Sequence, residues 1–183
     1  MTEASETDRQ ALLSVRCQRG EREAWAELVS GWERPLFYYL RRMSPTDEEA
    51  LSLLQDVWVR VFSNLGSLSQ PERLAPWLYV IARRTWARRF AVSAREAVSM
   101  EDEGELEQHE PVEEHGDAEA MHQALGLIAL RDREVLTLFY LDDLSLAEVA
   151  EVLEIPAGTV KSRLSHARAR LRAQLQRMKV KDD

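Results

Sequence analysis

Residues 144–170 read LSLAEVAEVLEIPAGTVKSRLSHARAR, and this stretch decides the fold of the C-terminal part of the chain. Ser145 is followed three residues later by Glu148, a spacing that predicts the capping box at the start of an α-helix. Pro156 interrupts the helical pattern and fits the first turn of a second helix. A short helix, a tight turn and a longer basic helix together predict a helix-turn-helix.

The longer helix has an apolar stripe on one side and basic side chains around the rest. The stripe repeats at three- and four-residue steps: Val160, Leu164, Ala167, Leu171 and Leu175. The side chains off the stripe are of the kinds that contact bases and phosphates: Thr159, Lys161, Ser162, Arg163, Ser165, His166, Arg168 and Arg170. The pattern predicts a DNA recognition helix, and a basic helix that only caps a bundle is the plainer alternative.

The N-terminal part is expected to be a larger helical bundle with an aromatic core. All five Trp lie before residue 91, together with most of the other aromatic residues. The apolar periodicity predicts a first helix that ends near Gly20. It also predicts a second helix from Trp25 to Leu40, kinked at Pro35, and a third helix that Ser44 caps. The whole chain is therefore predicted to be all-α.

The third helix, 47–65, is predicted to have an apolar face and an opposite polar face. The apolar face consists of Ala50, Leu53, Leu54, Val57, Trp58, Val61, Phe62 and Leu65. The polar face consists of Asp47, Glu48, Gln55, Asp56 and Arg60. Side chains one turn apart can touch a single partner surface, so we expect the polar face to be a docking site.

A fourth helix follows the Ser-rich loop 66–71 and carries a cluster of arginines. Its buried positions are predicted to be Trp77, Leu78, Ile81, Ala82 and Thr85. Its other face consists of Arg83, Arg84, Trp86, Arg88 and Arg89. Arginines neutralise phosphates and an exposed Trp stacks on an unpaired base, so this face resembles a platform for single-stranded nucleic acid. An ordinary solvated face with Trp86 partly buried fits the same pattern.

The acidic residues are concentrated between these two parts. Residues 91–117 carry 1 Lys+Arg and 10 Asp+Glu, whereas residues 118–183 carry 10 of each. This composition predicts a flexible acidic linker at 96–117, between helical domains at 1–95 and 118–183. The segments Arg73–Arg95 and Pro156–Lys181 contain no acid. We therefore expect the linker to compete with DNA phosphates for Arg83–Arg95 and Lys161–Lys181 in the free protein. The plainer alternative is that its acids only keep the protein soluble and the linker extended.

Several classes of protein are excluded by composition. The chain has 183 residues, one Cys, and no apolar run of the roughly 20 residues that a membrane span needs. A polar start without a leader pattern indicates a cytoplasmic protein. No phosphate-binding loop or metalloprotease motif occurs, so we expect neither an enzyme nor a cofactor or small-molecule substrate. The linker histidines His109, His115 and His122 are weak candidates for a metal, because ordering a flexible segment costs entropy.

The quoted residues resemble those of the extracytoplasmic-function sigma factors of bacterial RNA polymerase. The C-terminal resemblance covers Leu144–Leu153, Ile155–Leu164 and Ala167–Leu171. The N-terminal one covers Glu23-Ala-Trp25, Asp47–Leu51, Leu54–Phe62 and Pro76–Arg83. The two parts occur in the family's order, over about residues 8–95 and 118–180.

The resemblance implies a role for each part of the chain. Helix 47–65 would dock on the clamp helices of core RNA polymerase. Loop 66–75 and helix 76–90 would melt and read the minus-ten promoter element, and helix 156–172 would read the minus-thirty-five element. An anti-sigma factor is a further possible partner.

The chain departs from the family pattern at three positions. Arg84 and Arg88 replace the usual Asn and Asp, and Glu154 replaces the usual Gly of the turn. A Pro that often opens the helix near residue 131 is also missing. Two other functions fit the sequence less well: an ordinary helix-turn-helix regulator with a sensor domain, and an adaptor that kept the fold without binding DNA. Both DNA-facing basic surfaces are retained, which favours the sigma factor.

Overall fold

Every regular element in the described part of the chain is a helix. The computed structural model describes residues 3–97, 121 and 123–181. The elements are α1 (Glu3–Gln18), α2 (Arg22–Met43), α3 (Asp47–Asn64), η1 (Leu65–Ser67), η2 (Pro71–Arg73), α4 (Leu74–Ala97), α6 (Leu130–Leu136), η3 (Thr137–Leu141), α7 (Leu146–Leu153) and α8 (Ala157–Lys181). The predicted all-α fold is confirmed for these residues. None of these helices has the length and apolar character that a membrane span requires.

The predicted linker, apart from its first two residues at the end of α4, lies outside the described residues. The three histidines considered as metal ligands, His109, His115 and His122, lie outside them as well.

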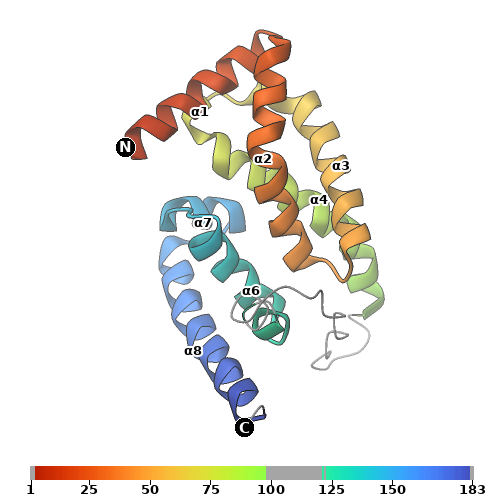
Figure 1. The fold of residues 1–183 in the computed structure, drawn as a ribbon, viewed down its shortest axis with the longest axis vertical. Coiled ribbons are helices and arrows are strands. Elements are labelled where there is room, and N and C mark those ends of the chain that lie inside the picture. Colours follow the sequence, from red (N-terminus) through yellow and green to blue (C-terminus); the bar gives the residue numbers. More distant parts are fainter. Residues whose placement is uncertain (1–2, 98–120, 122, 182–183) are drawn as a thin grey trace.

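Helices α1 to α4 form a bundle in which α3 packs against both α2 and α4 (Figure 1). Its core is aromatic as predicted, but its centre is a pair of tyrosines. Tyr39 and Tyr79 are almost completely buried, and their ring centroids lie 5.4 Å apart in an edge-to-face arrangement. Among the five Trp, Trp58 is buried, and the other four are half-buried around the core.

The start of α3 differs from the prediction. Ser44 ends α2 and is buried, so it is not the N-cap of α3. Thr46 is the N-cap, and its hydroxyl accepts a hydrogen bond from the backbone N–H of Glu49 at 3.2 Å. A side chain can cap a helix only when it reaches the free N–H groups of the first turn, which Thr46 does. α2 continues through Pro35 as a single helix.

The helix predicted from Leu127 to Leu141 begins three residues later, at Leu130, and its last turn is the π-helical element η3. The buried Arg133 guanidinium donates to the carbonyls of Leu125 at 2.8 Å and Gly126 at 2.7 Å. These carbonyls are bonded to a side chain, so the chain turns before α6 begins.

The predicted helix-turn-helix is formed by α7 and α8. The Ser145 hydroxyl accepts from the backbone N–H of Glu148, and the Glu148 carboxylate accepts from the backbone N–H of Ser145, so the capping box is confirmed. Glu154 ends α7 in the left-handed conformation, with φ 56° and ψ 41°. α8 then begins at Ala157, directly after Pro156.

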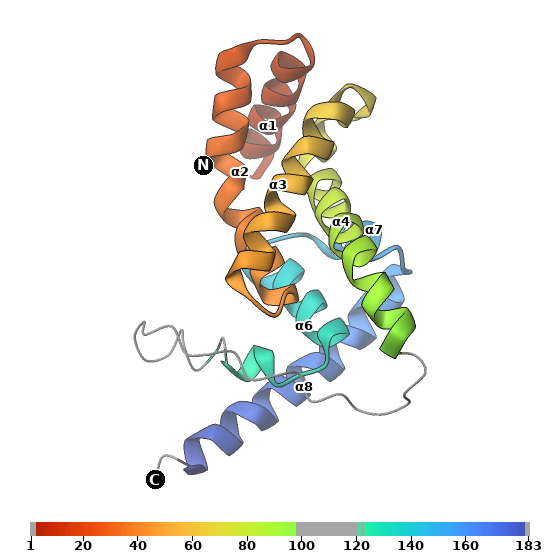
Figure 2. The ribbon, with the colours of Figure 1, turned by 90° about the vertical axis from the view of Figure 1, so that its right-hand side faces the viewer.

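The helix-turn-helix packs directly on the N-terminal bundle. α7 lies against α4, and α6 lies against α2 (Figures 1 and 2). α8 packs on α6 and α7 and then extends away from the bundle to the C-terminus (Figure 1). The buried apolar residues of the two parts form one continuous cluster. The two surfaces predicted to read different DNA elements lie on α4 and α8, and both of these helices pack against α7.

Candidate nucleic-acid and polymerase interfaces

α8 has the predicted division into an apolar stripe and a polar surface. Val160, Leu164 and Ala167 are buried where α8 meets α6 and α7. The predicted DNA-contacting residues Thr159, Lys161, Ser162, Ser165, His166, Arg168 and Arg170 are exposed, and Arg163 is half-buried. The structure thus brings this set together on one exposed helix surface.

Two arginines of this set bond to other side chains. Arg168 Nη1 donates to the hydroxyl of Tyr140 at 3.2 Å, and no carboxylate of the described residues forms an ion pair with it. Arg170 forms an ion pair with Asp132, a side chain that is only 2% exposed. A buried carboxylate needs a cationic partner, so Arg170 stabilises the packing of α8 on α6.

The predicted single-strand surface lies along α4, but most of its arginines have intramolecular partners. Three form ion pairs: Arg83 with Glu134 (3.1 Å), Arg84 with Glu154 (2.7 Å) and Arg89 with Asp56 (2.7 Å). Arg88 is exposed, and no described residue forms an ion pair with it. Two of these pairs, those of Arg83 and Arg84, join α4 to the C-terminal part of the chain.

Trp86 is not an exposed ring, which corrects the interpretation of this residue as a stacking platform. Its indole Nε1 donates to the backbone carbonyl of Met43 at 2.9 Å, and its ring packs against Phe90 with 5.4 Å between centroids. A half-buried indole whose N–H is bonded anchors one helix to another. Trp86 thus holds α4 against the end of α2.

An open hollow of about 470 Å³ lies beside the start of α4. It is lined by Ser67, Leu68, Ser69, Gln70, Arg73, Trp77 and Glu151. Its residues from 67 to 77 belong to the predicted minus-ten loop and to the start of α4. Glu151 comes from α7 and forms an ion pair with Arg73. Arg73 and Trp77 were not among the predicted site residues, although both lie in or next to that loop and in the acid-free segment.

The predicted docking residues of α3 are exposed, apart from Arg60, which is half-buried. Asp47, at the helix start, forms an ion pair with Arg41. Asp56 pairs with Arg89 of α4, so the predicted docking face adjoins the predicted single-strand face. Glu48 and Gln55 are exposed on the same helix.

The same helix also exposes large apolar side chains that the sequence interpretation missed. Leu51 is 52% exposed, Val59 is 65% exposed, and Phe62 is 52% exposed. Phe62 was predicted to face the core; instead its ring lies against Trp25, with 4.6 Å between centroids. These three residues and Gln55 follow one another at three- and four-residue steps and form one stripe. The sequence did contain a signal for this stripe, because Leu51 and Val59 each lie four residues from Gln55 and therefore share its side of the helix.

The contact between the two parts of the chain contains buried polar groups. The Tyr39 hydroxyl donates to Glu134 Oε1 at 2.9 Å, and Arg83 Nε donates to the same oxygen at 3.1 Å. Burial raises the pKa of Tyr39, and the Glu134 carboxylate adds to this effect. Arg133 Nη1 donates to the backbone carbonyl of Arg42 at 2.8 Å, and burial lowers the pKa of its guanidinium.

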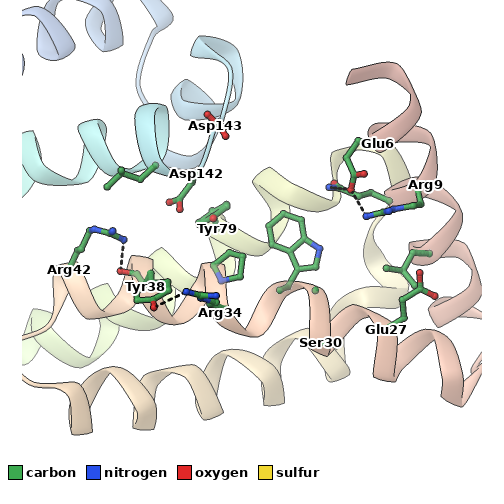
Figure 3. Close-up of a pocket in the computed structure, with 16 residues that line it drawn as sticks. Glu6, Arg9, Glu27, Ser30, Arg34, Tyr38, Arg42, Tyr79, Asp142 and Asp143 are labelled. Atoms are coloured by element: carbon green, nitrogen blue, oxygen red, sulfur yellow. Dashed lines mark hydrogen bonds and ion pairs between the residues drawn. The ribbon is translucent and has the colours of Figure 1, made fainter. Parts of the chain in front are cut away.

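A cleft of about 750 Å³ lies between α1, α2 and the segment that follows η3 (Figure 3). Asp142 points into it from the C-terminal part, towards Tyr79 of α4 (Figure 3). Burial raises the pKa of Asp142 to about 7, although the hydrogen bond from Tyr79 and the charge of Arg42 act against this. The Oδ2 atom of Asp142 is buried and has no hydrogen-bond partner among the residues that the structure describes. Across the described ranges, no cluster of His, Cys, Asp and Glu suited to a metal ion occurs.

Two family models match the chain. The model for sigma-70 region 2 matches residues 28–96, and the model for sigma-70 region 4 matches residues 118–171. The first match includes α3 and the arginine cluster of α4. The second includes the helix-turn-helix.

Curated relatives and a solved structure match along most of the chain. RNA polymerase sigma factor SigV of Bacillus subtilis is 30% identical over 128 residues, which cover 70% of this chain and 76% of SigV. ECF RNA polymerase sigma factor SigW of Bacillus subtilis is 27% identical over 172 residues, covering 86% of this chain and 92% of SigW. The fold resembles that of sigma factor RpoE in its complex with the anti-sigma factor NepR from Bartonella quintana, with a TM-score of 0.70 and 22% identity over 83% of this chain and 96% of RpoE. The chain belongs to the extracytoplasmic-function group of RNA polymerase sigma factors, which act in transcription initiation.

Proposed function

We propose that the chain binds core RNA polymerase through α3 and directs it to promoters through α4 and α8. The observation that carries this proposal is an exposed basic recognition helix, α8, behind a capped α7, in a chain that also exposes a docking stripe on α3. We assign no catalytic step to the chain and place its action in the cytoplasm, where transcription takes place.

The polymerase site is proposed to combine the polar and apolar residues exposed on α3. Its polar members are Asp47, Glu48, Gln55, Asp56 and Arg60, and its apolar members are Leu51, Val59 and Phe62. Exposed apolar side chains with a charged border are typical of a protein interface. This composition supports a docking site, because burying three large exposed apolar residues against a partner would provide favourable binding free energy.

The minus-ten site is proposed to consist of the arginines of α4 and the hollow beside the 66–75 loop. Arg84, Arg88 and Arg89 supply charge for the phosphates, and Trp77 supplies an aromatic wall of the hollow. Trp86 keeps a positioning role, because its N–H is bonded to Met43. Arg83 is held by Glu134 and is also a positioning residue.

The minus-thirty-five site is proposed to be the exposed surface of α8. Lys161, Ser162 and Ser165 would contact base edges near the start of the helix. Thr159, Arg163, His166 and Arg168 would contact phosphates and set the register. Arg170 is assigned to the fold because it neutralises Asp132.

Reconstituted transcription tests this function. Purified chain and core RNA polymerase are incubated with a pooled library of templates that carry randomised minus-ten and minus-thirty-five elements, and the transcribed templates are sequenced. We expect enriched motifs at both elements. Lys161→Ala should alter only the minus-thirty-five motif, whereas Arg88→Ala, which removes a phosphate contact, should lower transcription from all templates without altering either motif. A set of transcripts without a motif at either element would contradict the proposal.

An anti-sigma factor is a further proposed partner. It is supported by the fold shared with RpoE, which was solved with NepR, and by the open cleft between the two parts of the chain. Two assays test this proposal with purified candidate inhibitors, both membrane-associated and soluble. An anti-sigma factor must bind the purified chain in a pull-down, and it must also reduce transcription in the reconstituted system.

A further inference from the structure

Two of the positions at which the chain departs from the family pattern are bonded to each other. Arg84 Nη2 lies 2.7 Å from Glu154 Oε1, and Arg84 Nε lies 3.1 Å from the same oxygen. One residue belongs to the proposed minus-ten surface on α4, and the other to the turn of the helix-turn-helix. The hydrogen bonds from Arg84 lower the pKa of the Glu154 carboxyl, so the pair is charged at neutral pH.

A second carboxylate of the same helix is placed in the same way. Glu151 lies one turn before Glu154 and forms an ion pair with Arg73, in the hollow beside the proposed minus-ten loop. Residues three apart on a helix lie on the same side, so α7 directs both carboxylates at α4 and η2. Each carboxylate takes the place that a DNA phosphate would occupy on its arginine.

The closed arrangement is incompatible with reading a promoter. The two elements are named for positions about 25 base pairs apart, which is roughly 85 Å along B-form DNA at about 3.4 Å per step. In the structure α7 packs on α4, and α8 packs on α7. The two DNA surfaces cannot therefore contact their elements at the same time unless α7 leaves α4.

We propose that the free protein inhibits itself through α7 and the turn after it, whose Glu151 and Glu154 occupy Arg73 and Arg84 of the minus-ten site and hold the two DNA-reading parts together. That the masked surface reads the minus-ten element rests on the proposed function, whereas the contact between α7 and α4 does not. The carboxylates on Arg73 and Arg84 come from the helix-turn-helix, whereas Arg89 pairs with Asp56 of α3. Polymerase, by holding the two parts apart, frees Arg73 and Arg84 for DNA.

The contact is suited to a reversible switch. Its two outer ion pairs, Arg73–Glu151 and Arg84–Glu154, are partly or largely exposed, and such pairs are individually weak. They are therefore open to competition from DNA phosphates and from salt. The buried contact of Tyr39, Arg83 and Glu134 keeps the parts aligned while the outer pairs break and reform.

DNA affinity of the free chain provides the first test. Glu151→Gln/Glu154→Gln frees both arginines and removes two charges, and Asp8→Asn/Glu33→Gln, on α1 and α2, removes two exposed charges that do not pair with Arg73 or Arg84. At low salt we expect the first variant to bind a mixed-sequence single-stranded DNA roughly ten-fold more tightly than the control, because apparent affinity scales with the open fraction. The difference should vanish at high salt. Equal affinities of the two variants at low salt would overturn the masking.

A charge exchange provides a second test that does not involve DNA. Fluorescent labels are placed at Ala26→Cys on α2 and Ala173→Cys on α8, both exposed positions. The native Cys17 is 2% exposed, and burial raises the pKa of its thiol to about 11, so it reacts slowly. Arg84→Glu and Glu154→Arg should each raise the open fraction roughly three- to ten-fold, as energy transfer reports, and the double variant should restore the closed form.

Arg88→Glu reverses the same charge on the same helix without a partner on α7, and it should leave energy transfer unchanged. Failure of Arg84→Glu/Glu154→Arg to restore the closed form would overturn the proposed contact. If no variant binds DNA while the charge exchange succeeds, the assignment of the minus-ten surface fails and the closing contact stands.

Discussion

Glu154 combines a strained backbone with a side chain that bonds across the molecule. Its left-handed φ of 56° favours glycine, which has no Cβ to clash with the following carbonyl. Both Glu154→Gly and Glu154→Gln lose the ion pair with Arg84, but only the first also relaxes the turn. We expect Glu154→Gly to melt about 2 to 4 °C above Glu154→Gln. Thermal unfolding monitored by circular dichroism measures this, and a lower melting temperature for the glycine variant would contradict it.

Asp142 makes stability depend on pH near neutrality. The pKa of Asp142 in the folded chain is about 7, above the ordinary value of 3.8. The protonated carboxyl therefore adds fully to the free energy of unfolding below pH 3.8, and this stabilisation is lost as the pH rises through 7. Asp142→Asn removes this titration. Relative to the unmodified chain, the variant should gain roughly 2 to 4 kcal/mol of unfolding free energy between about pH 4 and about pH 8.

Urea unfolding at the two pH values measures this gain. Glu33→Gln, which removes an exposed carboxyl on α2 that does not act on Asp142, serves as the control and should follow the unmodified chain. Parallel pH profiles for the unmodified chain and Asp142→Asn would show that the Asp142 carboxyl does not titrate in this range.

Arg168 and Arg170 are two residues apart on α8 and should respond differently to substitution. Arg168→Ala should weaken binding about equally on all promoters and reduce the slope of log affinity against log salt by roughly one unit. Arg170→Ala leaves the buried Asp132 without its partner and should cost roughly 1 to 3 kcal/mol of unfolding free energy. Salt titrations of DNA binding and urea unfolding separate the two roles. A loss of stability in Arg168→Ala would contradict the division.

At the scale of the element, α3 is expected to dock through its exposed stripe. Val59 is 65% exposed, so Val59→Asp should change the unfolding free energy by no more than about 0.5 kcal/mol. The same change should weaken binding to core polymerase at least roughly ten-fold, because a charge would enter an apolar contact. Leu12→Asp on α1, at 61% exposed, is the matched control and should bind normally in the same pull-down. An equal loss of polymerase binding in Val59→Asp and Leu12→Asp would contradict the assignment of the docking site to α3.

The helices were predictable from the sequence because each has a local signal. The capping box at Ser145, the apolar stripe of α8 and the buried side of α3 depend on residues a few positions apart. The exposure of Phe62 and the bonding of Trp86 were not predictable, because both depend on a partner from another helix: Trp25 for the first and Met43 for the second. The periodicity of one helix does not contain that information.

The candidate site was predictable to a similar extent. Sequence types and spacing predicted the α8 set and the arginines of α4, and both sets lie together on their helices. Spacing did not predict that Arg84 would face Glu154, which lies 70 residues away along the chain. Pairings of this kind follow from the packing of α7 on α4.

At the scale of the whole molecule, the continuous core predicts a single cooperative unfolding transition for the described helices. Glu134→Ala removes the shared acceptor of the Tyr39 hydroxyl and Arg83 Nε, and it should cost roughly 2 to 3 kcal/mol. Scanning calorimetry should then resolve two transitions, because the N-terminal bundle and the helix-turn-helix lose their buried link. Glu33→Ala, an exposed change on α2, should keep one transition. One unchanged transition in both variants would argue against a coupling role for Glu134.

The pairing of Arg84 with Glu154 also limits how freely halves of such proteins can be recombined. A chimera that joins this N-terminal bundle to a helix-turn-helix with Gly at the turn would leave Arg84 unpaired and its closed form weakened. The reciprocal chimera would place Glu154 opposite the usual Asn, with the strained turn retained and no cation to face it. Arg84 and Glu154 are therefore expected to be inherited together. A chimera built from this chain should keep its DNA-binding arginines masked in the absence of polymerase only when both residues come from the same parent.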